Sequence, residues 1–123
     1  MARILIAEDE AHIARVMSLW LTRHGHTVTE TVNGALALEV LRRESVDVVV
    51  SDMNMPEMDG ATLASRIRKE LKLEIPILLL TARCDHAKVQ QQLLPLGVRL
   101  YTKPFVPSRL VSDIEEWVGV ANA

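Results

Sequence analysis

The sequence predicts an α/β protein in which five parallel strands alternate with five helices. Short runs that are apolar throughout recur along the chain, as in strands buried on both faces of a parallel sheet. Between them lie segments whose apolar residues recur three and four positions apart, which is typical of one face of a helix. Strict alternation of these two patterns favours a parallel sheet covered by helices on both faces.

Five segments are candidates for the strands. Residues 4–7, 48–50 and 77–80 are apolar throughout, so we expect them at the centre of the sheet. Residues 27–32 and 98–102 mix polar, apolar and β-branched residues, which suits strands at the edges. Three central and two edge strands match the flavodoxin-like order 2-1-3-4-5 in a (βα)5 three-layer sandwich.

Five helices are predicted between and after these strands. The first ends before Gly25, a residue typical of helix C-termini, the second follows a turn at Asn33, and the third begins near Asp59. The fourth is the weakest, and Pro95 should shorten it. Their apolar faces comprise Ile13, Val16, Met17, Trp20 and Leu21; Ala37, Val40 and Leu41; Leu63, Ala64, Ile67 and Leu71; Val89 and Leu93; and Leu110, Ile114, Trp117 and Val118.

Size and composition predict one ordinary globular domain over residues 1–123. Hydrophobic residues make up 49% and charged residues 24% of the chain, which excludes a disordered protein. A net charge of -2 without a basic run argues against direct binding of nucleic acid. One cysteine excludes an internal disulfide, and no apolar run approaches the length of a membrane helix. We expect a cytoplasmic protein that does not enter a membrane.

Polar side chains follow the strands at the edge where ligands bind in open α/β sheets. Glu8 and Asp9 follow the first strand, Asp52 the third, Thr81 the fourth and Lys103 the fifth. Because the carboxyl ends of parallel strands meet at one edge, we expect these side chains to converge there.

Three carboxylates at one edge repel one another, and a hard cation such as Mg²⁺ would relieve that repulsion. Asp9 and Asp52 could bind the ion directly, Glu8 through water, and the backbone carbonyl of Asn54 could add another oxygen. The Asp52 carboxylate could then act as a nucleophile and form an aspartyl phosphate. Lys103 would supply a cation and Thr81 a hydroxyl to the charged oxygens of the phosphoryl group.

Four segments resemble the receiver domains of two-component response regulators, and the resemblance to these chemotaxis-regulator-like domains covers essentially the whole chain. The segments read ILIAEDE at 4–10, SDMNMPEMDG at 51–60, PILLLTAR at 76–83 and TKPF at 102–105. The second is the most specific, because it places Asp, Met-Pro and Met-Asp-Gly directly after an apolar strand. Four such segments in the right order make a strong signal.

The resemblance implies a regulator that is not an enzyme, and that accepts a phosphoryl group from a sensor histidine kinase or a phosphotransfer protein. It implies Mg²⁺ as the cofactor, with Mn²⁺ as a substitute. It also implies a response of helix four, strand five and helix five toward an unknown target, as a monomer or a phosphorylation-dependent dimer. The resemblance assigns the role of phosphoacceptor to Asp52, and the role of metal ligand to Glu8, Asp9, Asp52 and the Asn54 carbonyl. It assigns phosphate sensing to Thr81, Ala82 and Lys103. It also implies a cis peptide bond before Pro104 and an effect of Asn54 and Arg83 on the lifetime of the phosphate.

The chain departs from the family pattern before the fifth strand. The family usually has an aromatic residue three positions before the lysine, where this chain has Leu100; Tyr101 lies one position later. The interval from Gly97 to Lys103 is one residue shorter than is common. Since side chains alternate along a strand, Leu100 and Tyr101 are both candidates for this part of the switch, and an unusual partner or coupling is expected.

Proteins of other classes fit the residues less well. A dehalogenase-type phosphatase needs a second Asp where this chain has Asn54, and a flavodoxin would not place acids at residues 8–10, beside its phosphate. An adaptor with a receiver fold that is never phosphorylated stays as the alternative. The four histidines do not form a zinc site and are expected at the surface.

Overall fold

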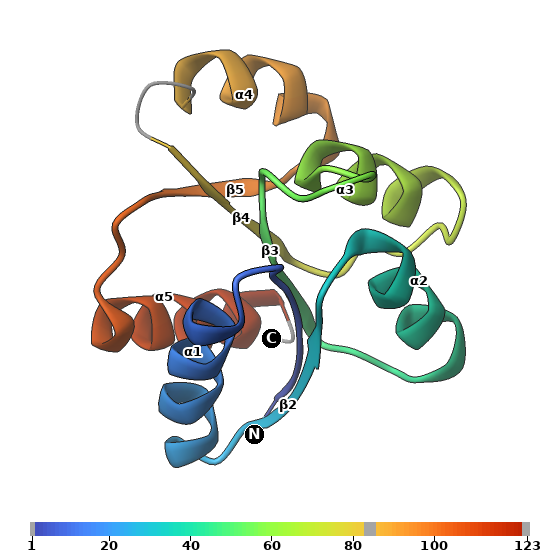
Figure 1. Ribbon diagram of the computed structural model, residues 1–123. Coiled ribbons are helices and arrows are strands. Elements are labelled where there is room, and N and C mark those ends of the chain that lie inside the picture. Colours follow the sequence, from blue (N-terminus) through green and yellow to red (C-terminus); the bar gives the residue numbers. More distant parts are fainter. Residues whose placement is uncertain (1, 83–85, 122–123) are drawn as a thin grey trace.

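The computed structural model describes residues 2–82 and 86–121 and confirms the predicted α/β fold (Figure 1). Each strand is followed by a helix. The strands are β1 (Arg3–Ala7), β2 (Thr27–Thr31), β3 (Val48–Asp52), β4 (Ile77–Thr81) and β5 (Arg99–Thr102). The helices are α1 (Ala11–Arg23), α2 (Gly34–Arg43), α3 (Gly60–Lys69), α4 (His86–Leu93), the 3₁₀ turn η2 (Leu94–Leu96) and α5 (Pro107–Ala121).

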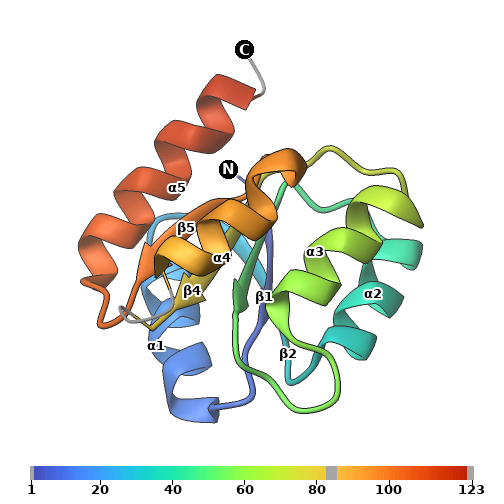
Figure 2. The ribbon, with the colours of Figure 1, turned by 90° about the horizontal axis from the view of Figure 1, so that it is seen from above.

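The sheet has the strand order β2-β1-β3-β4-β5, and all four neighbouring pairs are parallel. This order confirms the flavodoxin-like topology and the placement of the two mixed segments at the edges. Helices α1 and α5 cover one face, and α2, α3 and α4 cover the other (Figures 1 and 2). Among the described residues no helix is both long and apolar enough to cross a membrane.

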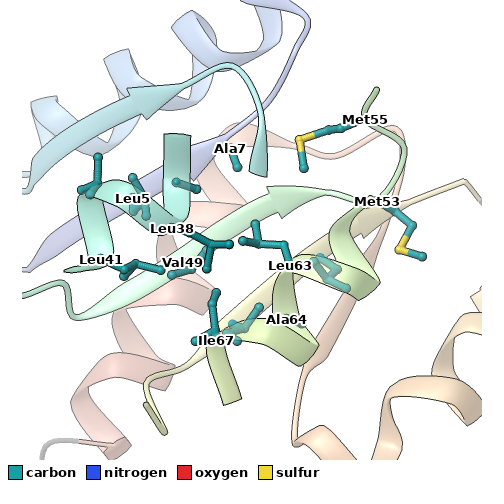
Figure 3. Packing of buried hydrophobic residues seen from close by; sticks show 14 of the residues in the cluster. Leu5, Ala7, Leu38, Leu41, Val49, Met53, Met55, Leu63, Ala64 and Ile67 are labelled. Atoms are coloured by element: carbon teal, nitrogen blue, oxygen red, sulfur yellow. The ribbon is translucent and has the colours of Figure 1, made fainter. Parts of the chain in front are cut away.

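The sheet separates two apolar clusters because successive side chains of a strand point to opposite faces. One cluster lies between the sheet and α2 and α3, where Leu5, Val49 and Ile67 are buried together (Figure 3). The other joins the sheet to α1 and α5 and contains Ile6 and Ile114. The apolar runs 48–50 and 77–80 are buried, as predicted, and so are the polar residues that end β3 and β4.

Local sequence explains where several helices begin and end. The side chain of Asn33 accepts a hydrogen bond from the Leu36 amide at 2.8 Å, and that of Asp59 accepts one from the Thr62 amide at 2.8 Å. These caps satisfy amides that have no partner within the helix. Pro95 lies in η2 directly after the eight residues of α4, in agreement with the predicted short helix.

The prediction that the histidines lie at the surface is wrong for His26. This residue is buried, its Nδ1 accepts a hydrogen bond from the Ala2 amide at 3.1 Å, and its Nε2 lies 2.7 Å from a carboxylate oxygen of Glu115. Because Nδ1 accepts, Nε2 carries the hydrogen and donates it to Glu115. The partners are 24 and 89 residues away, so no local pattern indicates this contact.

Candidate metal and phosphoacceptor site

The candidate residues are held in place because the hydrogen-bonded ladder continues beyond the strand ends. The Glu8 amide donates to the Thr31 carbonyl at 3.0 Å, and the Lys103 amide donates to the Thr81 carbonyl at 2.8 Å. Asp52 is the last residue of β3 and lies opposite Leu80 of β4. The strand ends therefore bring residues from distant parts of the sequence to one edge of the sheet, as the sequence predicts.

Three carboxylates gather at this edge. Oxygens of Glu8, Asp9 and Asp52 all lie within 4.8 Å of one another, and Glu8 and Asp52 are buried while Asp9 is exposed. Glu8 Oε1 accepts a hydrogen bond from the Glu10 amide at 3.1 Å, but its Oε2 is buried without a hydrogen-bond partner among the described residues. A buried, unpaired carboxylate oxygen beside two other carboxylates is the environment that a hard divalent cation stabilises. The donor set thus fits Mg²⁺.

Lys103 supplies the positive charge of the site. Its Nζ lies 2.6 Å from Oδ1 of Asp52. Burial raises the pKa of the Asp52 carboxyl, and the ion pair with Lys103 opposes that rise without cancelling it. For Lys103, burial lowers the pKa, but the bond to Asp52 and the nearby charge of Glu8 outweigh it, so the pKa lies above its ordinary value. Lys103 is therefore a permanent cation at neutral pH.

Thr81 is the last residue of β4, the strand that lies between β3 and β5. It is fully buried, and its hydroxyl lies 3.4 Å from the Ala82 carbonyl, at the long end of the hydrogen-bond range. Asn54 is exposed in the loop after β3, and the peptide bond between Lys103 and Pro104 is cis. Arg83, to which the resemblance assigns an effect on phosphate lifetime, lies outside the described residues.

Leu100 and Tyr101 point to opposite faces of β5. Leu100 pairs with Leu79 and packs against the α2/α3 cluster, so it lies on the face of Thr81. Tyr101 packs against the α1/α5 cluster, and its hydroxyl donates a hydrogen bond to the carboxylate of Asp113 in α5. Burial, reinforced by Asp113, raises the pKa of Tyr101 to about 12. The face that carries Thr81 therefore presents leucine at the position where the family usually has an aromatic residue.

The acidic cluster leads to a prediction about Glu8. Burial, together with the charge of Asp52, raises the pKa of Glu8 from its ordinary value of 4.5 to about 7. A raised folded-state pKa means that the carboxyl favours folding below pH 4.5 and loses that contribution as pH rises through 7. Glutamine at this position does not titrate, so without metal the variant Glu8→Gln should not lose this stability at high pH. We expect the free energy of unfolding of the variant, minus that of the parent, to be larger at pH 8 than at pH 5 by roughly 2–3 kcal/mol.

Urea unfolding of both proteins in EDTA at the two pH values measures this difference. If the two proteins differ in free energy of unfolding by the same amount at pH 5 and at pH 8, Glu8 does not titrate in this range. Adding Mg²⁺ supplies the matched control, because the ion should stabilise the parent at pH 8 and should stabilise Glu8→Gln less, since one of the three carboxylates is gone.

The fold and this arrangement of residues define a receiver domain of two-component response regulators. The response regulator receiver domain family matches residues 4–115, and the chain belongs to this family. The chain is 36% identical to a chemotaxis protein CheY homolog of Campylobacter jejuni, over 98% of this chain and 95% of that protein.

Two solved structures are also similar. The chemotaxis response regulator CheY4 of Vibrio cholerae has a TM-score of 0.86 and 30% identity, over 94% of this chain and 98% of its own. The response regulator TrrA of Thermotoga maritima, solved in complex with Mg²⁺ and BeF, has a TM-score of 0.81 and 28% identity, over 94% of this chain and 98% of its own.

Proposed function

We propose that this receiver domain accepts a phosphoryl group on Asp52 in a Mg²⁺-dependent reaction. The observation that carries the proposal is the buried oxygen of Glu8, which lacks a hydrogen-bond partner in the described part of the chain and lies beside Asp9 and Asp52, with Lys103 on the other side of Asp52. Without a cation, the carboxylates of such a cluster repel one another. With a bound cation, the cluster can hold an anionic phosphoryl donor. The complex of TrrA with Mg²⁺ and BeF supports this choice of ion.

The residues divide the work of phosphoryl transfer. Glu8, Asp9 and Asp52, with the backbone carbonyl of Asn54, would hold Mg²⁺, which neutralises charge on the phosphoryl oxygens when bound. An Asp52 carboxylate oxygen attacks phosphorus and forms the acyl phosphate, while the bond from phosphorus to the donor breaks and the leaving group takes its electron pair. The ammonium of Lys103 pairs with the Asp52 carboxylate before the transfer and with the phosphoryl oxygens after it.

Thr81 and Lys103 then act as the first parts of the switch. The long contact of the Thr81 hydroxyl is replaced by a stronger bond to a phosphoryl oxygen, in a strand neighbour of the phosphorylated residue. Because this bond exists only in the phosphorylated state, it shifts the equilibrium between two arrangements of α4, β5 and α5. Ala82 follows Thr81 in this movement, and Leu100 fills the space on the same face of the sheet.

The proposal extends to partners. A sensor histidine kinase or phosphotransfer protein would supply the phosphoryl group, and a protein target would read the changed surface. The protein would act as a phosphoacceptor rather than as an enzyme on other substrates. Mn²⁺ as a substitute ion, a cytoplasmic location, the single-domain organisation and the oligomeric state stay predictions. The adaptor alternative is not favoured, because the family and the complete acidic cluster both agree with a phosphorylated domain.

Intact-mass spectrometry after incubation with acetyl phosphate tests the proposal. In the presence of Mg²⁺ we expect one phosphoryl adduct per chain, and in EDTA none, because the carboxylates then repel the donor. Because a receiver could depend on its own kinase as donor, beryllofluoride binding in Mg²⁺ is measured beside it. Absence of both the adduct and beryllofluoride binding would return the adaptor alternative to first place.

A further inference from the structure

We propose that Arg68 is a positioning residue that acts through Lys103, by fixing the start of β5 to α3. The inference rests on the proposed function, because it concerns how Lys103 is placed beside Asp52. It follows from a closed series of contacts that begins and ends at Asp52. The series runs along α3 to Arg68, across to η2, and back along β5 to Lys103.

Arg68 binds the backbone of two segments that meet beside the end of α3. Its Nε donates to the Leu96 carbonyl in η2 at 2.8 Å, and its Nη1 donates to the carbonyls of Leu73 and Ile75 at 2.9 and 2.8 Å. Burial lowers the pKa of the guanidinium, which the charge of Glu74 opposes. A partly buried arginine that is bonded to three carbonyls holds those segments in one geometry, because its planar donors have fixed directions.

Helix α3 connects Arg68 rigidly to the phosphoacceptor. At its first residue, the Gly60 amide donates to the Met53 carbonyl at 2.8 Å. The backbones are so close here that a Cβ on Gly60 would lie 2.7 Å from the Asp52 carbonyl oxygen. A helix of ten residues is about 15 Å long, and Arg68 lies in its last turn. Figure 2 shows α3 running from the loop after β3 toward the segment that joins α3 to β4.

The return path from Leu96 to Lys103 consists of a turn followed by the extended strand β5. Gly97 turns the chain with φ +65°, and β5 begins two residues later. Thr102 pairs with Thr81, and the next residue, Lys103, places its Nζ 2.6 Å from Asp52. Because β5 is extended, a shift of Leu96 would be transmitted along the strand. The position of Leu96 therefore determines where Lys103 lies relative to Asp52.

A double-mutant cycle separates this role from simple stabilisation of the fold. The rate constant for phosphoryl uptake from acetyl phosphate in Mg²⁺ is measured for the full chain, for Arg68→Met, for Lys103→Ala and for the double variant. We expect Arg68→Met to slow uptake about tenfold when Lys103 is present and less than about twofold when it is absent. Equal slowing in both backgrounds, or none with Lys103 present, overturns the proposal.

The matched control is Arg66→Met. Arg66 lies on the same helix, carries the same charge and contacts Glu70 at 2.8 Å on the exposed side, so its loss should leave the rate unchanged. If Arg68→Met does not fold, Arg68→Lys takes its place in the cycle. An ammonium cannot serve three carbonyls in the geometry of a guanidinium, so the same coupling to Lys103 is expected.

Hydrogen exchange of the Lys103 amide provides a readout that needs no phosphodonor. This amide bonds to the Thr81 carbonyl, and we expect its exchange to speed up about tenfold in Arg68→Met and not in Arg66→Met, with the β1 amides unchanged in both. Unchanged exchange at Lys103 overturns the inference. If the parent protein neither takes up a phosphoryl group nor binds beryllofluoride, the proposed function fails while this exchange experiment still decides whether Arg68 anchors β5.

Discussion

Asp52→Asn is expected to abolish the phosphoryl adduct completely. The amide is similar in size to the carboxylate, so the fold and the neighbouring cluster should persist, but an amide is not a nucleophile toward phosphorus at neutral pH. It also removes one negative ligand from the metal site and the anionic partner of Lys103. Intact mass after incubation with acetyl phosphate and Mg²⁺ measures the effect as the fraction of chain that gains one phosphoryl group.

Asp59→Asn is the matched control for this variant. Asp59 is also an acid near the same edge of the sheet, but its side chain caps α3 by accepting from the Thr62 amide. Asparagine caps helices as well as aspartate does, so the helix should be unaffected and the adduct should form as in the parent. An adduct that persists in Asp52→Asn would place the phosphoacceptor on another residue, and loss of the adduct in both variants would point to the fold instead.

Gly60→Ala should produce the largest loss of stability among the single-methyl substitutions. The added Cβ would lie 2.7 Å from the Asp52 carbonyl oxygen and 3.0 Å from the Cα of Met53. Both atoms belong to backbone, which cannot rotate away, so α3 and the β3 end must separate. We expect a loss of roughly 1–3 kcal/mol in the free energy of unfolding, or roughly 4 °C in Tm for each kcal/mol, together with weaker phosphoryl uptake.

Two other glycines form a graded control series for thermal unfolding. A Cβ on Gly34 would meet the flexible end of Met58 at 2.6 Å, so Gly34→Ala should cost less than Gly60→Ala. A Cβ on Gly119, within α5, would meet no described residue within 4 Å, so Gly119→Ala should stabilise by roughly 0.5–1 kcal/mol through helix propensity. A loss of stability in Gly119→Ala equal to that in Gly60→Ala would mean that the close backbone approach does not determine the cost.

Sequence reasoning predicted the fold and the convergence of the candidate residues at one edge of the sheet, because both follow from local pattern and strand order. Continuous apolar runs distinguish central from edge strands, and the residue after each run is placed at the functional edge by topology alone. Glu8, Asp52 and Lys103 could therefore be selected before any distance was known. The 2.6 Å contact between Lys103 and Asp52 depends instead on the register of β5 against β4, and no sequence pattern encodes a register to that accuracy.

The features that sequence reasoning missed depend on partners far apart in the chain. His26 is buried by contacts with Ala2 and Glu115. The residues next to it in sequence would be equally compatible with an exposed histidine. In the sequence, Arg68 is one of several basic residues at the end of α3. It is distinguished from them only in the structure, where its side chain bonds to the backbone of η2. Both are polar side chains that bond to backbone or to a distant carboxylate, and periodicity carries no signal for such bonds.

Both tryptophans lie on one side of the sheet, and this distribution decides what an optical experiment can observe. Trp20 and Trp117 pack against the α1/α5 cluster, and the guanidinium of Arg99 lies 4.5 Å from the centroid of the Trp117 ring. Intrinsic fluorescence of this protein therefore reports on the α1/α5 side of the sheet, with Trp117 at the contact between β5 and α5 and Trp20 on α1. A rearrangement confined to the side of Thr81 and Leu100 would leave the indole emission unaltered, so a label there is needed to follow it by spectroscopy.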